Sequence, residues 1–259
     1  MKRTLLTFGI FAVAMLLSCV ASAKNIAGYP TVDGWEYTVY DDGTADLTKA
    51  PGATGAVVIP ETITYEGNTY TVTKLDDSLF DSNQNITAIQ LPSGLKELGG
   101  RAIAWCTNLE TVTGGPEELE HIGQYNFVDS KWRANQPDGP VYFKKWLIGC
   151  NGTYSEDVFA MAEGTIGMMS EGKYEGIHSK VFRIPASVSF FAANYLTDFY
   201  DGLQYLERFE VDEANKFFFN DEVGAIYSKN KTAEAHDVDY TGISFDALPI
   251  ANPVKVYNV

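Results

Sequence analysis

The side chains that most often perform acid–base and nucleophilic chemistry are few in this chain. Its three histidines are His121, His178 and His236, and none stands beside a serine or cysteine in a nucleophile motif. The segment His236-Asp237-Val238-Asp239 offers alternate side chains to a metal ion, but mixed ligands on an acidic tail are more typical of a solvated loop. The sequence therefore indicates no catalytic constellation, no metal site and no cofactor, and we predict that the protein is not an enzyme.

A second acidic run, Asp41-Asp42-Gly43-Thr44-Ala45-Asp46, concentrates oxygen ligands in a short loop, as calcium sites do. It lacks the regular ligand spacing and the terminal glutamate of a calcium loop. An Asp-Gly pair between tyrosine-rich strands favours a tight hairpin turn instead. We predict a hairpin here.

An aromatic and basic stretch between residues 131 and 146 is unusual in an acidic chain. Its rings Trp132, Tyr142 and Trp146 lie near several lysines and arginines, and could form a platform on which a glycan stacks. The alternative is that half of the rings belong to the core, because side chains alternate between the two faces of a strand. Glycan binding through this stretch is the second of two predicted functions.

Internal repeats are the elements that must position any binding surface. The segment Asn85-Ile86-Thr87-Ala88-Ile89-Gln90-Leu91-Pro92 recurs as Asn108-Leu109-Glu110-Thr111-Val112-Thr113-Gly114. The offset from Ile89 to Val112 is 23 residues, and that from Leu98 to Ile122 is 24. A fixed period in this range predicts a solenoid, in which thin coils bury their apolar sides against one another.

Within a repeat, Ile89 and Leu91 share one face of a short strand, and Pro92 ends the pairing because it has no N–H to donate. A second array follows at residues 182–191 and 206–212, whereas residues 128–177 depart from the period. Stacked strands bring their outward side chains side by side into a sheet surface for a large ligand. The predicted surface comprises Thr87, Gln90, Glu110, Thr111, Thr113, Lys180, Arg183, Glu207, Arg208 and Glu210.

The N-terminal residues have the order of a secretory signal peptide: Lys2 and Arg3, an apolar run from Leu5 to Leu17, and small residues ending at Ala23. Cleavage after Ala23 competes with a bacterial lipobox that would make Cys19 the lipidated first residue. Both routes predict export, to the medium, the bacterial cell surface or the periplasm, with membrane contact only through a lipid on Cys19.

Cleavage after residue 23 leaves 17 basic against 34 acidic residues, a net charge of −17. Nucleic acid is excluded as a partner because neutralising phosphates needs clustered lysines and arginines. If Cys19 is removed or lipidated, only Cys106 and Cys150 remain, too few for a disulfide-stapled scaffold. A bridge between them stays open, but two buried thiols are favoured.

The repeats resemble the BspA-type leucine-rich-repeat family of bacterial surface proteins. The matching features are the entry segment 58–72, the Ile/Leu-Pro units, and Ala104-Trp105-Cys106-Thr107-Asn108-Leu109, and similarity extends over about residues 36–231. The resemblance implies a β-rich leucine-rich-repeat solenoid, a curved right-handed stack of short parallel strands with turns or short helices on its convex side. It also implies an interior position for Cys106.

The sequence predicts four parts: a signal peptide over residues 1–23, a small N-terminal β cap over 24–72, a solenoid over 73–212 with an irregular insertion at 128–177, and a C-terminal cap and tail over 213–259. As the first of the two functions, we expect a monomeric, non-enzymatic adhesion protein. It would present its repeat-built sheet to a protein ligand, such as host matrix or another cell's surface.

Overall fold

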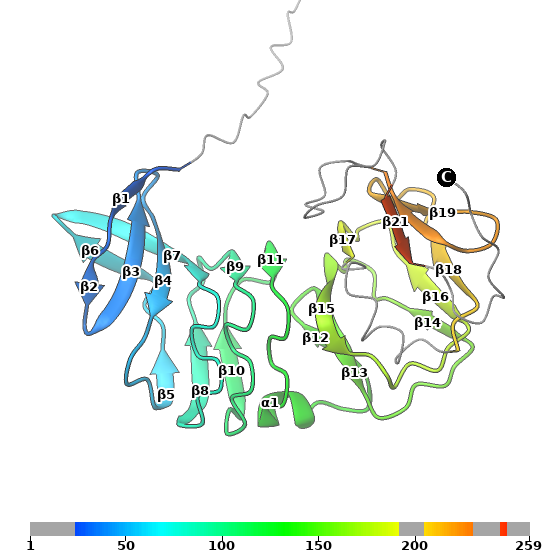
Figure 1. Ribbon diagram of the computed structural model, residues 1–259, viewed down its shortest axis with the longest axis horizontal. Coiled ribbons are helices and arrows are strands. Elements are labelled where there is room, and N and C mark those ends of the chain that lie inside the picture. Colours follow the sequence, from blue (N-terminus) through cyan, green and yellow to red (C-terminus); the bar gives the residue numbers. More distant parts are fainter. Residues whose placement is uncertain (1–23, 192–204, 230–243, 248–259) are drawn as a thin grey trace, which may run out of the picture.

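The computed structural model describes residues 24–191, 205–229 and 244–247, which form a stack of short strands (Figure 1). Strands of successive coils pair in parallel, as in a solenoid. The predicted β-rich repeat solenoid is therefore confirmed. The predicted signal peptide, Cys19 and the segment 236–239 lie outside the described residues.

Antiparallel strands cap the N-terminal end of the stack. Strand β3 (Trp35–Tyr40) pairs with β1 (Ile26–Gly28), β2 (Thr31–Val32) and β4 (Thr44–Lys49), while β6 (Thr62–Tyr65) pairs with β7 (Asn68–Leu75). The β3–β4 connection is the predicted hairpin. The Asp42 carboxylate accepts hydrogen bonds from the N–H and hydroxyl of Thr44, at 3.0 and 2.6 Å, and Gly43 has the positive φ of 82° that the turn requires.

Two rows of parallel strands then form the first array. One row continues from β4 and β7 to β9 (Glu97–Leu98) and β11 (His121–Ile122). The other comprises β5 (Gly55–Val58), β8 (Ile86–Leu91) and β10 (Thr111–Gly114). Their connections are turns, and α1 (Lys131–Ala134) is the only helix in the described residues.

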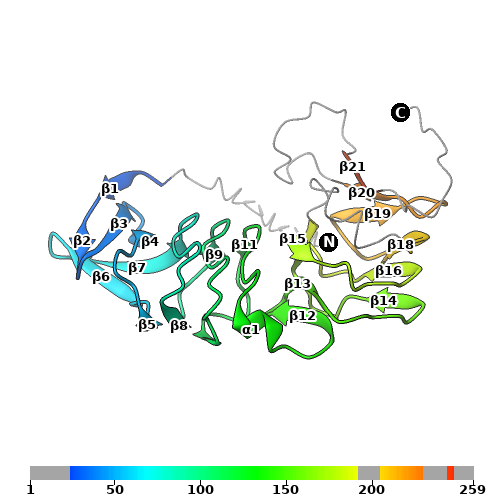
Figure 2. The ribbon, with the colours of Figure 1, turned by 60° about the horizontal axis from the view of Figure 1, so that its bottom comes forward.

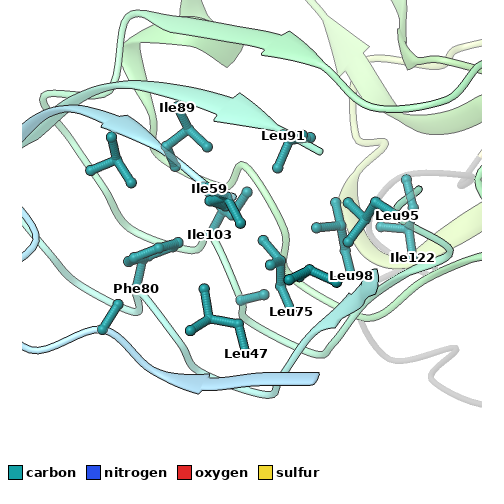
Figure 3. Packing of buried hydrophobic residues seen from close by; sticks show 14 of the residues in the cluster. Leu47, Ile59, Leu75, Phe80, Ile89, Leu91, Leu95, Leu98, Ile103 and Ile122 are labelled. Atoms are coloured by element: carbon teal, nitrogen blue, oxygen red, sulfur yellow. The ribbon is translucent and has the colours of Figure 1, made fainter. Parts of the chain in front are cut away.

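The core of the first array lies between these two rows (Figure 3). Leu75, Leu98 and Ile122 point inward from the first row, and Ile89 and Leu91 point inward from the second. All five are at most 2 % exposed. Burying each such side chain stabilises the fold by about 1.5–3 kcal/mol, so every coil depends on its neighbours.

A hairpin opens the second array after α1. Strands β12 (Gly139–Phe143) and β13 (Trp146–Asn151) are antiparallel, and β13 then pairs in parallel with β15 (Gly167–Lys173), which pairs with β17 (Phe190–Phe191). The opposite row stacks β14 (Val158–Ala160), β16 (Val181–Ile184) and β18 (Arg208–Val211) (Figure 2). These strands enclose a second apolar core.

Repeat geometry resumes inside the segment predicted to be an irregular insertion. Phe159 of β14 pairs with Phe182 of β16, 23 residues later, so the repeat spacing is present at residues 158–160 of this segment. The sequence did not reveal this repeat because a proline that usually follows the strand is missing. Ala162 stands 23 residues before Pro185, so the end of the strand could not be recognised.

The C-terminal described strands are β19 (Phe218–Asn220), β20 (Ile226–Ser228) and β21 (Ser244–Ala247), which pair antiparallel beside β18. Among the described residues, no helix has the length and apolar character needed to cross a membrane.

Candidate binding surfaces

The outward side of the β5–β8–β10 sheet carries two regular rungs of side chains. Strand register places Ala56, Ala88 and Thr111 in one rung. The next rung consists of Val58, Gln90 and Thr113. Alternation along the strands sends the intervening residues inward, where Val57 and Ile89 are buried. We call these six outward residues the neutral face, since none of them is charged.

The polar side chains of the neutral face are free to bond a partner. Gln90, Thr111 and Thr113 are exposed, and their side chains make no hydrogen bond with another described residue. Thr87, at the start of β8, is exposed in the same way. Val58 is 62 % exposed, which is high for a large apolar side chain. This surface therefore combines unused hydrogen-bonding groups with an apolar contact.

Strand β5 adds Ala56 and Val58, which the sequence prediction missed. The signal was present, because Ile59-Pro60 follows Val58 as Leu91-Pro92 follows Gln90, the residue that pairs with Val58. The resemblance to the family placed residues 58–72 in an entry segment before the first full repeat. The structure instead makes β5 the first strand of this row.

The β14–β16–β18 sheet presents a different chemistry. Glu210 of β18 accepts hydrogen bonds through one carboxylate oxygen from Arg183 at 3.2 and 2.8 Å, and through the other from Arg208 at 3.1 and 2.6 Å. These bonds, first those from Arg183, lower the pKa of Glu210. Lys180 and Glu207 form a longer pair at 3.9 Å. We call these five residues the charged face; its charges already satisfy one another.

The predicted single sheet surface is in fact two separate sheets. Strand β10 does not continue to β14, because α1 and the β12–β13 hairpin lie between the arrays (Figure 1). The N–H of Trp132, in α1, donates to the carbonyl of Leu109 at 2.6 Å, and Lys131 pairs with Glu110 at 3.0 Å. The helix therefore occupies the edge of the sheet where a fourth parallel strand would have paired. Glu110 is engaged in its ion pair with Lys131 of this helix.

A family model described as BspA type leucine rich repeat region matches residues 61–134 in six copies. The chain carries a BspA-type leucine-rich-repeat region. The matched residues contain β8 and β10, so two strands of the neutral face belong to this region. No functionally curated protein matches the chain.

Several solved structures of repeat proteins are similar to the chain. A leucine rich cell surface protein from Faecalibacterium prausnitzii is 17 % identical over 87 % of this chain and 62 % of its own, with a TM-score of 0.47. A leucine-rich repeat protein from Bacteroides capillosus is 19 % identical over 71 % of this chain and 98 % of its own, with a TM-score of 0.34. The pneumococcal vaccine antigen PcpA is 15 % identical over 80 % and 55 %, with a TM-score of 0.37. This chain thus spans less than two thirds of the Faecalibacterium protein.

The rings predicted to form a glycan platform, those of Trp132, Tyr142 and Trp146, are not all exposed. Trp146 is fully buried, and its indole N–H donates to the carbonyl of Leu119 at 2.8 Å. Tyr142 is half-buried and accepts a hydrogen bond from the N–H of Ala162 at 2.9 Å. Trp132 is half-buried too, with its ring centroid 4.8 Å from that of Phe127. Trp146 thus packs inside the fold and the other two rings are partly covered, so the three rings do not form one exposed platform.

The two remaining cysteines are buried, unpaired thiols, which confirms the favoured interpretation. Cys106 lies in the interior of the leucine-rich-repeat region, where its thiol donates to the carbonyl of Phe80 at 3.0 Å. Burial raises the pKa of Cys106 to about 11, and that of Cys150 to about 11 as well. Neither thiol is a nucleophile at neutral pH.

The described histidines stand among aromatic rings. His121 packs edge-on against Trp146 and Phe190, and His178 packs against Tyr205 with the two rings tilted by 45°. Within the described part of the chain, no three His, Cys, Asp or Glu side chains converge on a position suited to a metal ion.

Proposed function

We propose that this protein is an exported, non-enzymatic adhesion module that binds a protein ligand outside the cell through its neutral face. The observation that carries the proposal is the two uncharged rungs, with side-chain groups unused by the fold, on a chain of net charge −15. Export rests on the signal-peptide pattern of residues 1–23.

Desolvation favours the neutral face over the charged face. A partner that covers Thr111, Thr113 and Gln90 removes water from neutral groups and can replace it with its own hydrogen bonds. A partner on the charged face would have to desolvate the Arg183–Glu210–Arg208 network. Because these charges already pair with one another, the partner would gain little Coulomb energy in return. The exposed Val58 adds apolar area at one edge of the neutral face.

The proposal is tested by measuring equilibrium binding of residues 24–259 to a panel of purified extracellular matrix proteins. Thr113→Arg places a long cation at the β10 end of the Val58–Gln90–Thr113 rung. Thr64→Arg is the matched control, since Thr64 is an exposed threonine on β6, outside this sheet.

We expect Thr113→Arg to weaken binding at least about tenfold, which corresponds to about 1.4 kcal/mol, and Thr64→Arg to leave it unchanged. Circular dichroism confirms that both variants are folded. Equal affinity of wild type and Thr113→Arg for every bound matrix protein would remove the neutral face as the binding surface.

A further inference from the structure

A pocket of about 550 Å³ opens beside α1, away from both sheet faces. Three segments line it: residues 129–138 from α1 and the following turn, residues 150–153 after β13, and residues 173–178 after β15. The pocket thus lies where the two arrays join. Its volume is within the range of about 300–1,000 Å³ that small-ligand sites occupy.

A buried arginine forms part of the wall. Arg133 is only 5 % exposed, and its guanidinium donates to the carbonyls of Ile148, Cys150 and Lys173 at 3.3–3.5 Å. It forms no ion pair with a described residue, and its Nε has no hydrogen-bond partner there. Burial lowers the pKa of Arg133, but the group remains a cation. These long bonds leave the charge incompletely satisfied.

The backbone is shaped around this guanidinium. Gly149 has φ of 150°, and a Cβ at that position would overlap Nη2 of Arg133. Gly149 therefore makes the room that the side chain occupies.

Unfilled acceptors face the same pocket. The carboxylates of Asp138 and Glu175 make no hydrogen bond or ion pair with a described residue. Asn151 donates through Nδ2 to the carbonyls of Arg133 and Gln136, both at 3.0 Å, which leaves its Oδ1 free. The remaining carboxylate, Asp129, is bound to Lys173 at 2.5 Å. The pocket thus offers several acceptors around one buried cation.

One ring of the lining borders these polar groups and packs against a second ring outside the lining. The ring of His178, which lines the pocket, lies 4.4 Å from that of Tyr205, centroid to centroid. Tyr205 remains 44 % exposed. Such rings offer an apolar surface for the C–H groups of a ligand.

We propose that this pocket binds a neutral saccharide unit of one or two rings. A sugar hydroxyl both donates and accepts, so it can bond Asp138 and Glu175 as a donor and Thr153 as an acceptor without burying a new charge. A simple anion would face the two free carboxylates, and a simple cation would face Arg133. A neutral polyol is the ligand class that avoids both repulsions.

Ligand-observed NMR tests the proposal with residues 24–259 and a panel of neutral hexoses and disaccharides. We expect binding with Kd of about 1 mM, typical of a small polar ligand in an open site. Asp138→Asn with Glu175→Gln should weaken it about tenfold, because charged acceptors form the stronger hydrogen bonds. Glu163→Gln is the matched control, an exposed glutamate outside the pocket that should change nothing.

Two results would overturn the proposal: no sugar of the panel binding, or sugar binding that survives the double substitution. Inorganic phosphate is titrated in parallel, and phosphate binding without sugar binding would also reject the assignment. The Thr113→Arg variant should keep its sugar affinity, so this site and the proposed function can fail separately.

Discussion

Trp146 donates its indole N–H to the carbonyl oxygen of Leu119 at 2.8 Å, and this hydrogen bond ties β13 of the second array to the chain before β11 of the first. Strands β11 and β13 do not pair with each other. Instead, the rings of His121, Trp146 and Phe190 pack together, with the His121 centroid 5.9 Å from that of Trp146 and 5.2 Å from that of Phe190. Side chains, in place of a strand ladder, thus join the two arrays.

The first prediction concerns this joint. Trp146→Phe keeps an aromatic ring but leaves the buried Leu119 carbonyl without its donor, so we expect a loss of about 2 kcal/mol in the free energy of unfolding. Urea unfolding followed by circular dichroism measures it. Trp105→Phe is the control: Trp105 is half-buried beside Tyr125 and should lose less than about 1 kcal/mol. Equal losses of unfolding free energy in the two variants would show that the hydrogen bond from Trp146 to Leu119 does not stabilise the fold.

A buried asparagine provides the second prediction. Asn126 is fully buried, accepts the N–H of Ile103 at 2.9 Å, and donates to the carbonyls of Gly99 and Gly123 at 2.9 and 2.8 Å. Asn126→Ala leaves the N–H of Ile103 and the carbonyl of Gly123 unpaired, and the carbonyl of Gly99 keeps only its bond from the N–H of Ala102; we expect the substitution to cost about 3 kcal/mol.

Asn108→Ala is the matched control for this variant. Asn108 is exposed, and its side chain donates only to the carbonyl of Gln84, so its loss should cost less than about 1 kcal/mol. Urea midpoints compare the two variants. A shift for Asn126→Ala no larger than that for Asn108→Ala would refute a structural role for the buried amide.

Much of the fold was predictable because the repeat spacing indicates which residues of neighbouring coils lie side by side. The 23-residue period placed Ile89 and Val112 in register, and the structure pairs these residues. Buried polar residues such as Asn126 escaped prediction, since asparagine is more often exposed and its hydrogen bonds reach backbone groups in another coil. Residues 158–160 escaped because the repeat there lacks its proline.

The surface was less predictable than the fold. Alternation along the strand identified Gln90 and Thr113 as outward, but not that α1 would separate their sheet from that of Arg183. That separation depends on a four-residue helix, whose start at Ser130 is a common N-cap but whose contact with β10 is tertiary. Arg133 lies in the basic stretch of the sequence, but its burial follows from the same tertiary contact and could not be predicted.

The third prediction is a pH dependence of the charged face. The pKa of Glu210 is lowered in the folded state, so its ion pairs stabilise the protein fully above the ordinary glutamate value of about 4.5. That contribution is lost as the pH falls through the lower folded pKa. Glu210→Gln should therefore lower the urea midpoint at pH 7 and lose its effect in acid. A difference from wild type that is constant from pH 7 down to about pH 3 would contradict this.

The last prediction concerns the thiols. Cys106 and Cys150 are buried, and their pKa values are raised to about 11, so both stay protonated and covered in the native state at pH 7. A disulfide-exchange reagent should therefore react slowly with native residues 24–259 and should label two thiols rapidly in denaturant. Cys150→Ser and Cys106→Ser, measured separately, assign each thiol. Failure to label either thiol after unfolding without reductant would indicate a bridge between them and overturn the assignment.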